Sequence, residues 1–404
     1  MHTCRRGRGG GQPPHTNHAH TIIKQGTRLH TPRCMLCAAL ASRTSLLRPT
    51  LWQTARPFMA TSSAPFIDPA LFKPTSIDEE TKTATANAME FARARPPDQA
   101  LTAQEARERR AKEYMADCVQ AFGHDGPPPQ REDRTVTHPS TGISVGVSIF
   151  RPKVAPTALR GVYYHMHGGG WYMGGAKYQN DIRLCKLADS LSVAIVSVDY
   201  RLSPEAKFPE PVDDCVTGAA WLADQSEAEF GTSVLIIGGE SAGGQLCAAT
   251  MLRLRSALGL PSGAPLPYRA ANLVYGIFDL AGTPSARAYG DRPLIFNTPQ
   301  FDWCTALYLP EGADRRAPDV SPLYATAAEL ASLPPALFTI GTDDPLLDDS
   351  LFMAARWASA GNHAELAVYP GGAHGIGHFG PHAHTALGQR AHRRIESFME
   401  RYLR

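Results

Sequence analysis

Short segments rich in apolar residues recur between residues 143 and 370 and are separated by longer stretches. Six of them are mainly apolar: Gly161–Met166, Val193–Val198, Val234–Ile237, Leu273–Phe278, Ala336–Ile340 and Leu366–Tyr369. Such runs suit strands that are buried on both faces of a parallel sheet. The segment Ile143–Arg151 instead alternates apolar and polar residues, which predicts a strand with one buried face.

Stretches with helical periodicity lie between these runs. They are Asn180–Asp189, Val212–Gln225, Gly244–Leu258 and Ser350–Ala360. Alternating strands and helices predict a layered α/β fold with a mostly parallel central sheet, flanking helices and right-handed crossovers. The region from Ile67 to about Gln120 reads as further helices. Leu280–Leu333 is too long for a simple connection, so it predicts a partly helical insertion.

Polar residues whose side chains could take part in catalysis follow the ends of the predicted strands. They are His167, Asp199, Ser241, Asp343, Asp344 and His374. Open parallel sheets bind ligands beyond the carboxyl ends of their strands. These residues, which span 207 positions from His167 to His374, are therefore expected to converge on one site.

Ser241 lies in Gly239–Gly244, which fits the G-x-S-x-G nucleophile elbow between a strand and a helix. A serine hydroxyl needs a base that accepts its proton and a third group that holds the base. His374, in a glycine-rich loop, is the expected base. Asp344, which precedes a proline, is the preferred acid, and Asp343 remains the alternative.

Other histidines and acids near these positions are interpreted differently. Asp348 and Asp349 are expected to cap the helix that begins near Ser350. The remaining histidines of this region are interpreted as surface residues: His363, His378, His382 and His384.

Three consecutive glycines follow His167. Glycines let backbone N–H groups approach the oxyanion that forms during acyl transfer. The expected donors are Gly168, Gly169 and Ala242, and His167 is expected to hold the loop in place. Neither a dinucleotide nor a P-loop glycine pattern is present.

Together these motifs resemble the hormone-sensitive-lipase family of α/β hydrolases, which includes carboxylesterases and arylacetamide deacetylase-like enzymes. The motifs are His167–Trp171, Asp199–Glu205, Gly239–Gly244, Ser321–Leu323, Asp344–Leu346 and His374–Gly375. The resemblance covers about residues 70–403. It implies the α/β-hydrolase fold, a triad of Ser241, Asp344 and His374, and a cap of N-terminal helices and an insertion near residues 281–320. It also implies local hydrogen bonding by Glu240 and a structural role for Asp199–Arg201.

Composition limits partners and location. The chain has 404 residues and a net charge of +2, which gives no reason to expect a nucleic-acid partner. No apolar run approaches the roughly 18 residues of a membrane span. Residues 1–67 contain nine Lys or Arg and no acidic residue, typical of a disordered or targeting extension. The eight cysteines of the whole chain are scattered, which suits an intracellular, cytoplasmic protein. Import into mitochondria or plastids is left open. The true start of the protein, at Met1, Met35 or Met59, is also left open.

The expected organisation is an extension over residues 1–67, a helical cap region over 68–130 and an α/β-hydrolase core over 131–404. The expected activity is a serine hydrolase that cleaves small-molecule carboxylic esters of small to medium acyl length through an acyl-enzyme, without metal or cofactor. An amidase, deacetylase or peptidase on the same scaffold, or a non-catalytic small-molecule receptor, is the alternative. A homodimer is left open.

Overall fold

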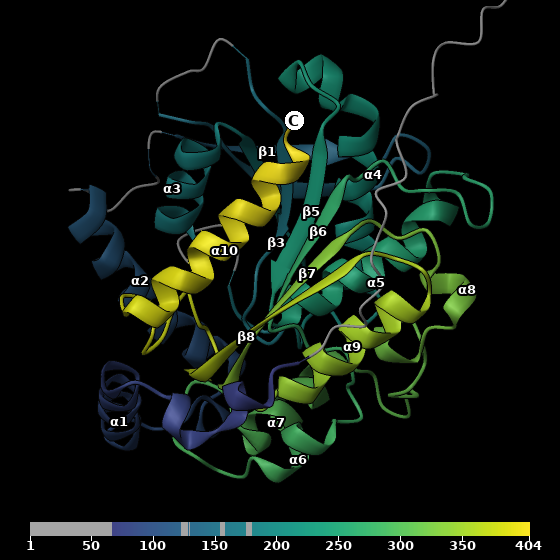
Figure 1. The fold of residues 1–404 in the computed structure, drawn as a ribbon. Coiled ribbons are helices and arrows are strands. Elements are labelled where there is room, and N and C mark those ends of the chain that lie inside the picture. Colours follow the sequence, from purple (N-terminus) through teal and green to yellow (C-terminus); the bar gives the residue numbers. More distant parts are fainter. Residues whose placement is uncertain (1–66, 123–127, 129, 154–157, 175–179) are drawn as a thin grey trace, which may run out of the picture. The chain divides into compact units, whose positions relative to one another are not determined.

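Eight strands form one sheet in the order β1-β2-β4-β3-β5-β6-β7-β8 (Figure 1). The strands are β1 Arg131–Thr137, β2 Ser144–Phe150, β3 Val162–Met166, β4 Ala194–Asp199, β5 Leu235–Glu240, β6 Ala270–Val274, β7 Ala336–Asp343 and β8 Ala364–Ala373. β1, β2 and β4 pair antiparallel, and the pairs from β4 to β8 are parallel. The expected mostly parallel sheet is confirmed.

This computed structural model describes residues 67–122, 128, 130–153, 158–174 and 180–404. The expected extension lies outside the described residues except for Ile67, so the targeting prediction stays a prediction. No helix within the described ranges is both long enough and apolar enough to cross a membrane.

Helices cover both faces of the sheet (Figure 1). α3 and α10 lie on one face, and α4, α5 and α9 lie on the other. Their bounds are α3 Asp181–Leu191, α4 Glu210–Phe230, α5 Ala242–Ala257, α9 Leu347–Ser359 and α10 Ala386–Tyr402. The core lies between these layers, where β3 is buried along its whole length and aromatic rings such as Phe338 and Trp357 pack edge to face.

The remaining helices precede β1 or interrupt the alternation. α1 Glu79–Arg93, the short helix η3 Asp98–Ala100 and α2 Ala103–Phe122 come before β1. The expected insertion between β6 and β7 contains α6 Pro284–Ala288, α7 Thr298–Tyr308, η4 Pro322–Tyr324 and α8 Ala327–Leu330, so its partly helical character is confirmed. α1, α6 and α7 lie at the lower edge of the sheet in Figure 1.

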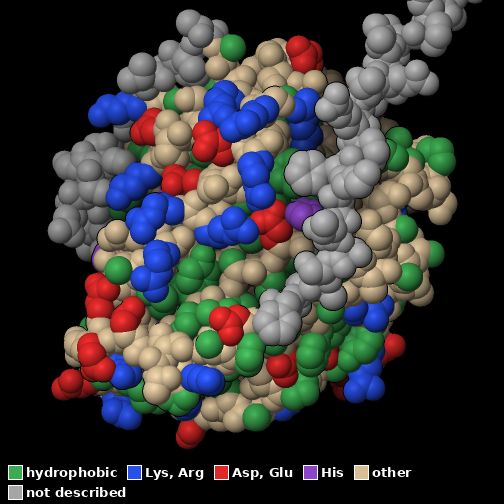
Figure 2. Space-filling view, viewed as in Figure 1, with side chains coloured by type: hydrophobic (Ala, Val, Ile, Leu, Met, Phe, Trp, Pro, Cys, Tyr) green, Lys and Arg blue, Asp and Glu red, His purple; other side chains and the backbone are tan. Residues whose placement is uncertain are grey.

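The α10 helix shows an amphipathic pattern. Its buried side includes Leu387, Ala391, Ile395 and Phe398, which recur at helical spacing. Figure 2 shows basic side chains gathered over its outer side, interspersed with acidic ones. Arg394 and Arg401 of α10 share the carboxylate of Glu365 on β8.

Several boundaries differ from those predicted. β6 ends at Val274, four residues before the predicted end, because Tyr275 turns the chain with a φ of 35°. β8 continues past Tyr369 to Ala373 and brings the chain directly to His374.

Candidate active site

The turn between β5 and α5 presents Ser241. Ser241 has φ 56° and ψ −121°, a conformation that non-glycine residues rarely adopt. A Cβ at Gly239 would lie 2.4 Å from the Gly243 carbonyl oxygen, and one at Gly243 would lie 2.0 Å from the Met166 carbonyl oxygen. Both glycines are therefore required for the tight crossing of helix and strand.

Ser241, His374 and Asp344 form a continuous chain of hydrogen bonds. Ser241 Oγ lies 2.9 Å from His374 Nε2, and His374 Nδ1 lies 2.9 Å from Asp344 Oδ2 and 3.2 Å from Oδ1. Asp344 Oδ1 also accepts the Leu346 N–H at 2.9 Å. All three side chains are nearly buried. The arrangement places a base beside the serine and a carboxylate behind the base.

The structure separates the two candidate acids. The Asp343 carboxylate binds the Arg292 guanidinium through both oxygens and makes no hydrogen bond to His374. The geometry therefore favours Asp344 over its neighbour as the partner of His374.

The expected capping role of Asp348 and Asp349 is wrong. α9 begins at Leu347, so both residues lie in its first turn. Asp349 is fully buried and accepts the N–H groups of Phe278 and Asp279 and the hydroxyl of Thr283. It thus ties α9 to the start of the insertion, and burial raises its pKa to about 7.

The surface interpretation of two histidines is also wrong. His382 is fully buried, and its Nε2 lies 3.3 Å from Thr85 Oγ1. His378 is largely enclosed, and its Nδ1 lies 2.8 Å from the Tyr275 hydroxyl, while the Tyr275 ring packs edge-on against His374. Burial and the charge of Arg183 hold the pKa of His378 well below its ordinary value, so its ring is neutral.

The glycine loop after β3 differs from the expectation at one position. The Gly168 N–H donates to Glu240 Oε1 at 3.3 Å, and Gly168 does not line the cavity beside Ser241. Because its N–H is already engaged, Gly168 is not available as an oxyanion donor, which differs from the expectation. Gly169 and Gly170 do line this cavity. Ala242 is the first residue of α5, where an N–H has no partner within the helix.

Other contacts fix the loop from behind. The Tyr200 hydroxyl donates to the His167 carbonyl oxygen at 2.8 Å, and the two rings stack with centroids 4.1 Å apart. His167 Nδ1 bonds the Gly168 carbonyl oxygen at 2.8 Å. These contacts agree with a structural role for His167 and Tyr200.

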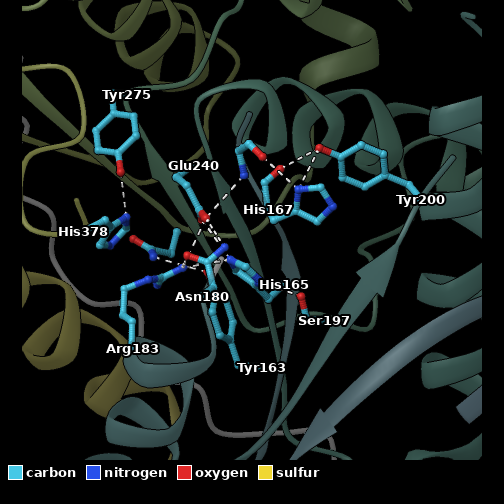
Figure 3. A network of polar contacts seen from close by, with 12 residues as sticks. Tyr163, His165, His167, Asn180, Arg183, Ser197, Tyr200, Glu240, Tyr275 and His378 are labelled. Carbon is cyan, nitrogen blue, oxygen red and sulfur yellow. Dashed lines mark hydrogen bonds and ion pairs between the residues drawn. The ribbon is translucent and has the colours of Figure 1, made fainter. Parts of the chain in front are cut away.

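A buried polar network surrounds Glu240, the residue before the serine (Figure 3). Glu240 Oε2 lies 2.8 Å from His165 Nε2, whose other nitrogen lies 2.9 Å from Ser197 Oγ. Glu240 Oε1 accepts from Asn180 and Arg183, both at 3.2 Å. Burial opposes the charge of Glu240, but His165 and Arg183 outweigh burial and hold its pKa below the ordinary range. Burial lowers the pKa of His165, so Arg183 is the cation that balances Glu240.

A cavity of about 930 Å³ opens in front of Ser241 and His374. Phe296 of the insertion stacks on the His374 ring with centroids 4.9 Å apart, and Leu294 and Phe379 add to the apolar wall. Residues of α1, η3 and α2 close the far side. Within the described ranges, no group of three or more His, Cys, Asp and Glu residues could hold a metal ion.

The comparisons with known proteins agree with this geometry. Residues 163–378 match the family described as having the alpha/beta hydrolase fold. Ethyl acetate hydrolase of Pseudomonas putida is 32% identical over 281 residues, which cover 69% of this chain and 84% of the relative. Carboxylesterase NlhH of Mycobacterium tuberculosis is 32% identical over 252 residues, which cover 61% and 76%.

Solved structures extend the similarity to most of the chain. An ester hydrolase from the metagenome of Lake Arreo gives a TM-score of 0.68 at 26% identity and covers 81% of this chain and 99% of its own. The esterase of Pyrobaculum calidifontis gives 0.64 at 28% identity and covers 77% and 97%. The fold, the matched residues and these relatives lead to one conclusion: the chain belongs to the hormone-sensitive-lipase-like family of α/β hydrolases.

Proposed function

We propose that this protein is a serine hydrolase that cleaves carboxylic esters of small to medium acyl length. The observation that carries the proposal is the chain of hydrogen bonds from Ser241 Oγ through both nitrogens of His374 to Asp344. The names of the relatives, an ethyl acetate hydrolase and a carboxylesterase, support an ester as substrate.

In the proposed reaction, Ser241 Oγ attacks the acyl carbon while His374 Nε2 takes the hydroxyl proton. Asp344 holds the ring through Nδ1 and stabilises the imidazolium. His374 then gives the proton to the leaving alkoxide, so that alcohol departs and an acyl-enzyme remains. His374 Nε2 then takes a proton from water, whose oxygen attacks the acyl carbon. As the bond from the acyl carbon to Ser241 Oγ breaks, His374 returns the proton to Oγ and the acid is released.

Charge on the former carbonyl oxygen would be held by the N–H groups of Gly169, Gly170 and Ala242. This set replaces Gly168 by Gly170 because the Gly168 N–H is already bound to Glu240. Gly169 has a φ of 117°, and a Cβ there would lie 2.3 Å from the Met173 carbonyl oxygen. A side chain at this position would therefore displace the loop, which makes Gly169→Val a poor test of the N–H alone.

We further propose that residues 68–130 and the insertion near residues 281–320 act as a cap over the α/β core. The cap supplies most of the cavity wall that faces Ser241, including Leu294 and Phe296. Apolar side chains such as these, in a concave wall that also carries polar groups, are typical of small-molecule sites.

The test is Ser241→Ala, with a panel of 4-nitrophenyl esters of increasing acyl length and matching arylamides. We expect kcat/KM for every ester to fall at least about a thousandfold, because loss of the nucleophile costs nearly as much as loss of the whole triad. Ser350→Ala is the matched control: Ser350 is fully buried in α9, and its hydroxyl has no hydrogen-bond partner among the described residues. A folded Ser241→Ala protein that keeps more than about a thousandth of the wild-type kcat/KM would contradict the proposal. If the wild type turned over arylamides faster than the matching esters, the proposed activity would change to that of an amidase.

A further inference from the structure

Arginine side chains gather on the cap side of the cavity. Arg93 ends α1, Arg95 follows it, and Arg109 and Arg110 lie on α2; all four line the cavity. This concentration of guanidinium groups has no role in the proposed acyl transfer.

Two carboxylates of the cap face these arginines. Asp98, which is buried, binds Arg109, and Arg109 also donates to the Pro96 carbonyl oxygen at 2.8 Å. Arg95 and Arg110 share Glu113, with Arg110 Nη1 3.2 Å from Glu113 Oε2. Two carboxylates thus pair with three guanidinium groups.

Arg93 adds a fourth positive charge to this wall of the cavity. The remaining carboxylate of the lining, Asp291, is exposed in the insertion. Positive charge therefore exceeds negative charge even when Asp291 is included. Burial lowers the pKa of Arg109, and the nearby charges of Arg110 and Arg95 lower it further. These cations repel one another, and an anion between them would relieve the repulsion.

The arginines stand close to the proposed site of chemistry. The Tyr172 hydroxyl donates to Asp98 Oδ2 at 2.7 Å, and the Tyr172 N–H donates to the Gly169 carbonyl oxygen at 3.2 Å. Tyr172 thus links the glycine loop, through its backbone, to the cluster, through its side chain. Leu294 and Phe296 supply apolar wall within the same cavity. The cavity therefore offers a nucleophile, an apolar wall and a cationic wall to one ligand.

We propose that the cavity selects esters that carry a free carboxylate at the end remote from the scissile bond, with Arg93 and Arg110 as the groups that recognise it. This inference rests on the proposed ester hydrolysis and names its substrate class. Among the three paired arginines, Arg110 has the longest contacts, at 3.2 Å from Glu113 and 4.0 Å from Asp98, so it can turn to a ligand with little loss. Guanidinium groups suit carboxylates because their N–H donors match both oxygens.

The test uses esters of matched length that differ in the charge of one end. In the first set the acyl part ends in a carboxylate (monoethyl adipate), a methyl group (ethyl hexanoate) or an ammonium group (ethyl 6-aminohexanoate). In the second set the alcohol part ends in a carboxylate (6-acetoxyhexanoate) or a methyl group (hexyl acetate). We expect the wild type to prefer the carboxylate over the ammonium ester in kcat/KM, and the preference to shrink as salt is raised. The set with the larger preference shows which part of the ester points to the cap.

Substitutions then assign the preference to named residues. Arg110→Gln should lower kcat/KM for the preferred carboxylate ester about tenfold and leave ethyl hexanoate within about twofold; Arg93→Gln should act in the same direction. Arg110→Lys should restore only part of the loss, because it keeps the charge but lacks the paired N–H donors that match both carboxylate oxygens. Arg134→Gln on β1 is the matched control: its side chain is 32% exposed, as is that of Arg110, and it pairs with glutamates away from this cavity.

The outcomes separate the two proposals. A folded wild type that hydrolyses none of these esters, even at high concentration, overturns the proposed function and this inference with it. Hydrolysis of ethyl hexanoate, with no carboxylate preference or with an equal fall for all esters in Arg110→Gln, overturns only this inference.

Discussion

Two charged clusters flank the proposed catalytic groups, and they differ in how their charges are balanced. Below the elbow, Glu240 and Arg183 form a buried pair whose side chains are 2% and 12% exposed, and His165 and Asn180 fill the remaining contacts of the carboxylate. In the cap, four arginines face two cap carboxylates and are partly open to solvent.

This difference indicates a division of labour. A buried and balanced cluster has no capacity left for a ligand, but it can fix the backbone that it touches, here the Gly168 N–H. A partly exposed cluster with excess positive charge contributes little to stability and keeps donors for an anion. The core cluster would thus set the rate of the reaction, and the cap cluster would set which ester enters.

The largest effect on kcat is expected from a substitution of Asp344, the acid of the proposed triad. Asp344→Asn should lower kcat by about 10⁴, because the amide no longer favours the working tautomer of His374. Asp343→Asn, its neighbour in the chain, breaks a pair with Arg292 that is partly exposed and should change kcat by less than about threefold. Steady-state kinetics on one ester measures both, and the reverse ranking would move the acid to Asp343.

A smaller effect on rate is expected from the buried network. Glu240→Gln leaves Arg183 without its balancing charge and loosens the hold on Gly168. We expect a loss of about 3 to 5 kcal/mol in the free energy of unfolding and a fall in kcat of about 10 to 100-fold with little change in KM.

The control for this prediction is another buried carboxylate. Asp214→Asn removes the charge that binds Arg201, and among the described residues Asp214 makes no hydrogen bond or ion pair with the glycine loop. It should lower stability but leave the kcat of the folded protein within about threefold. Equal kcat in both variants would show that Glu240 is only structural.

The stability that Asp349 contributes, where α9 meets the start of the insertion, should depend on pH. Asp349 joins α9 to the start of the insertion, and burial raises its pKa from 3.8 to about 7. The folded state therefore binds a proton that the unfolded state has lost between about pH 4 and 7, so this group's contribution to stability falls as the pH rises through that window.

The measurement compares wild type with Asp349→Asn, which mimics the protonated form. The Tm of the variant relative to wild type should rise by several degrees from pH 5 to pH 8, because each pKa unit corresponds to about 1.4 kcal/mol. A Tm difference that does not change between pH 5 and pH 8 would contradict the raised pKa of Asp349 in the folded protein.

The convergence of Ser241, His374 and Asp344 could be predicted from the sequence because each residue lies in a local motif. The elbow requires glycines at 239 and 243 for steric reasons that any sequence with this turn must meet. The register of the glycine loop was less predictable. Three equivalent glycines do not show which N–H is already bound, and Gly168 is engaged only because Glu240 is folded beneath it.

Other elements were missed for identifiable reasons. β1 was not predicted because Arg131–Arg134 are all charged, which is tolerated at the edge of a sheet. α10 was predictable in principle, because Leu387, Ala391 and Ile395 recur at helical spacing. The cap arginines belong to no motif, and their convergence depends on how α1 and α2 pack over the cavity. The groups proposed to recognise the substrate could therefore not be predicted from the sequence.

The most direct test of the central claim is covalent labelling of the nucleophile. Intact-mass spectrometry after reaction with a 4-nitrophenyl alkylphosphonate should show one phosphonyl group per chain, and peptide mapping should place it on Ser241. Labelling should be absent in Ser241→Ala, slow in Asp344→Asn and normal in Ser350→Ala. A phosphonyl group on another residue, or undiminished labelling of Ser241→Ala, would contradict Ser241 as the nucleophile.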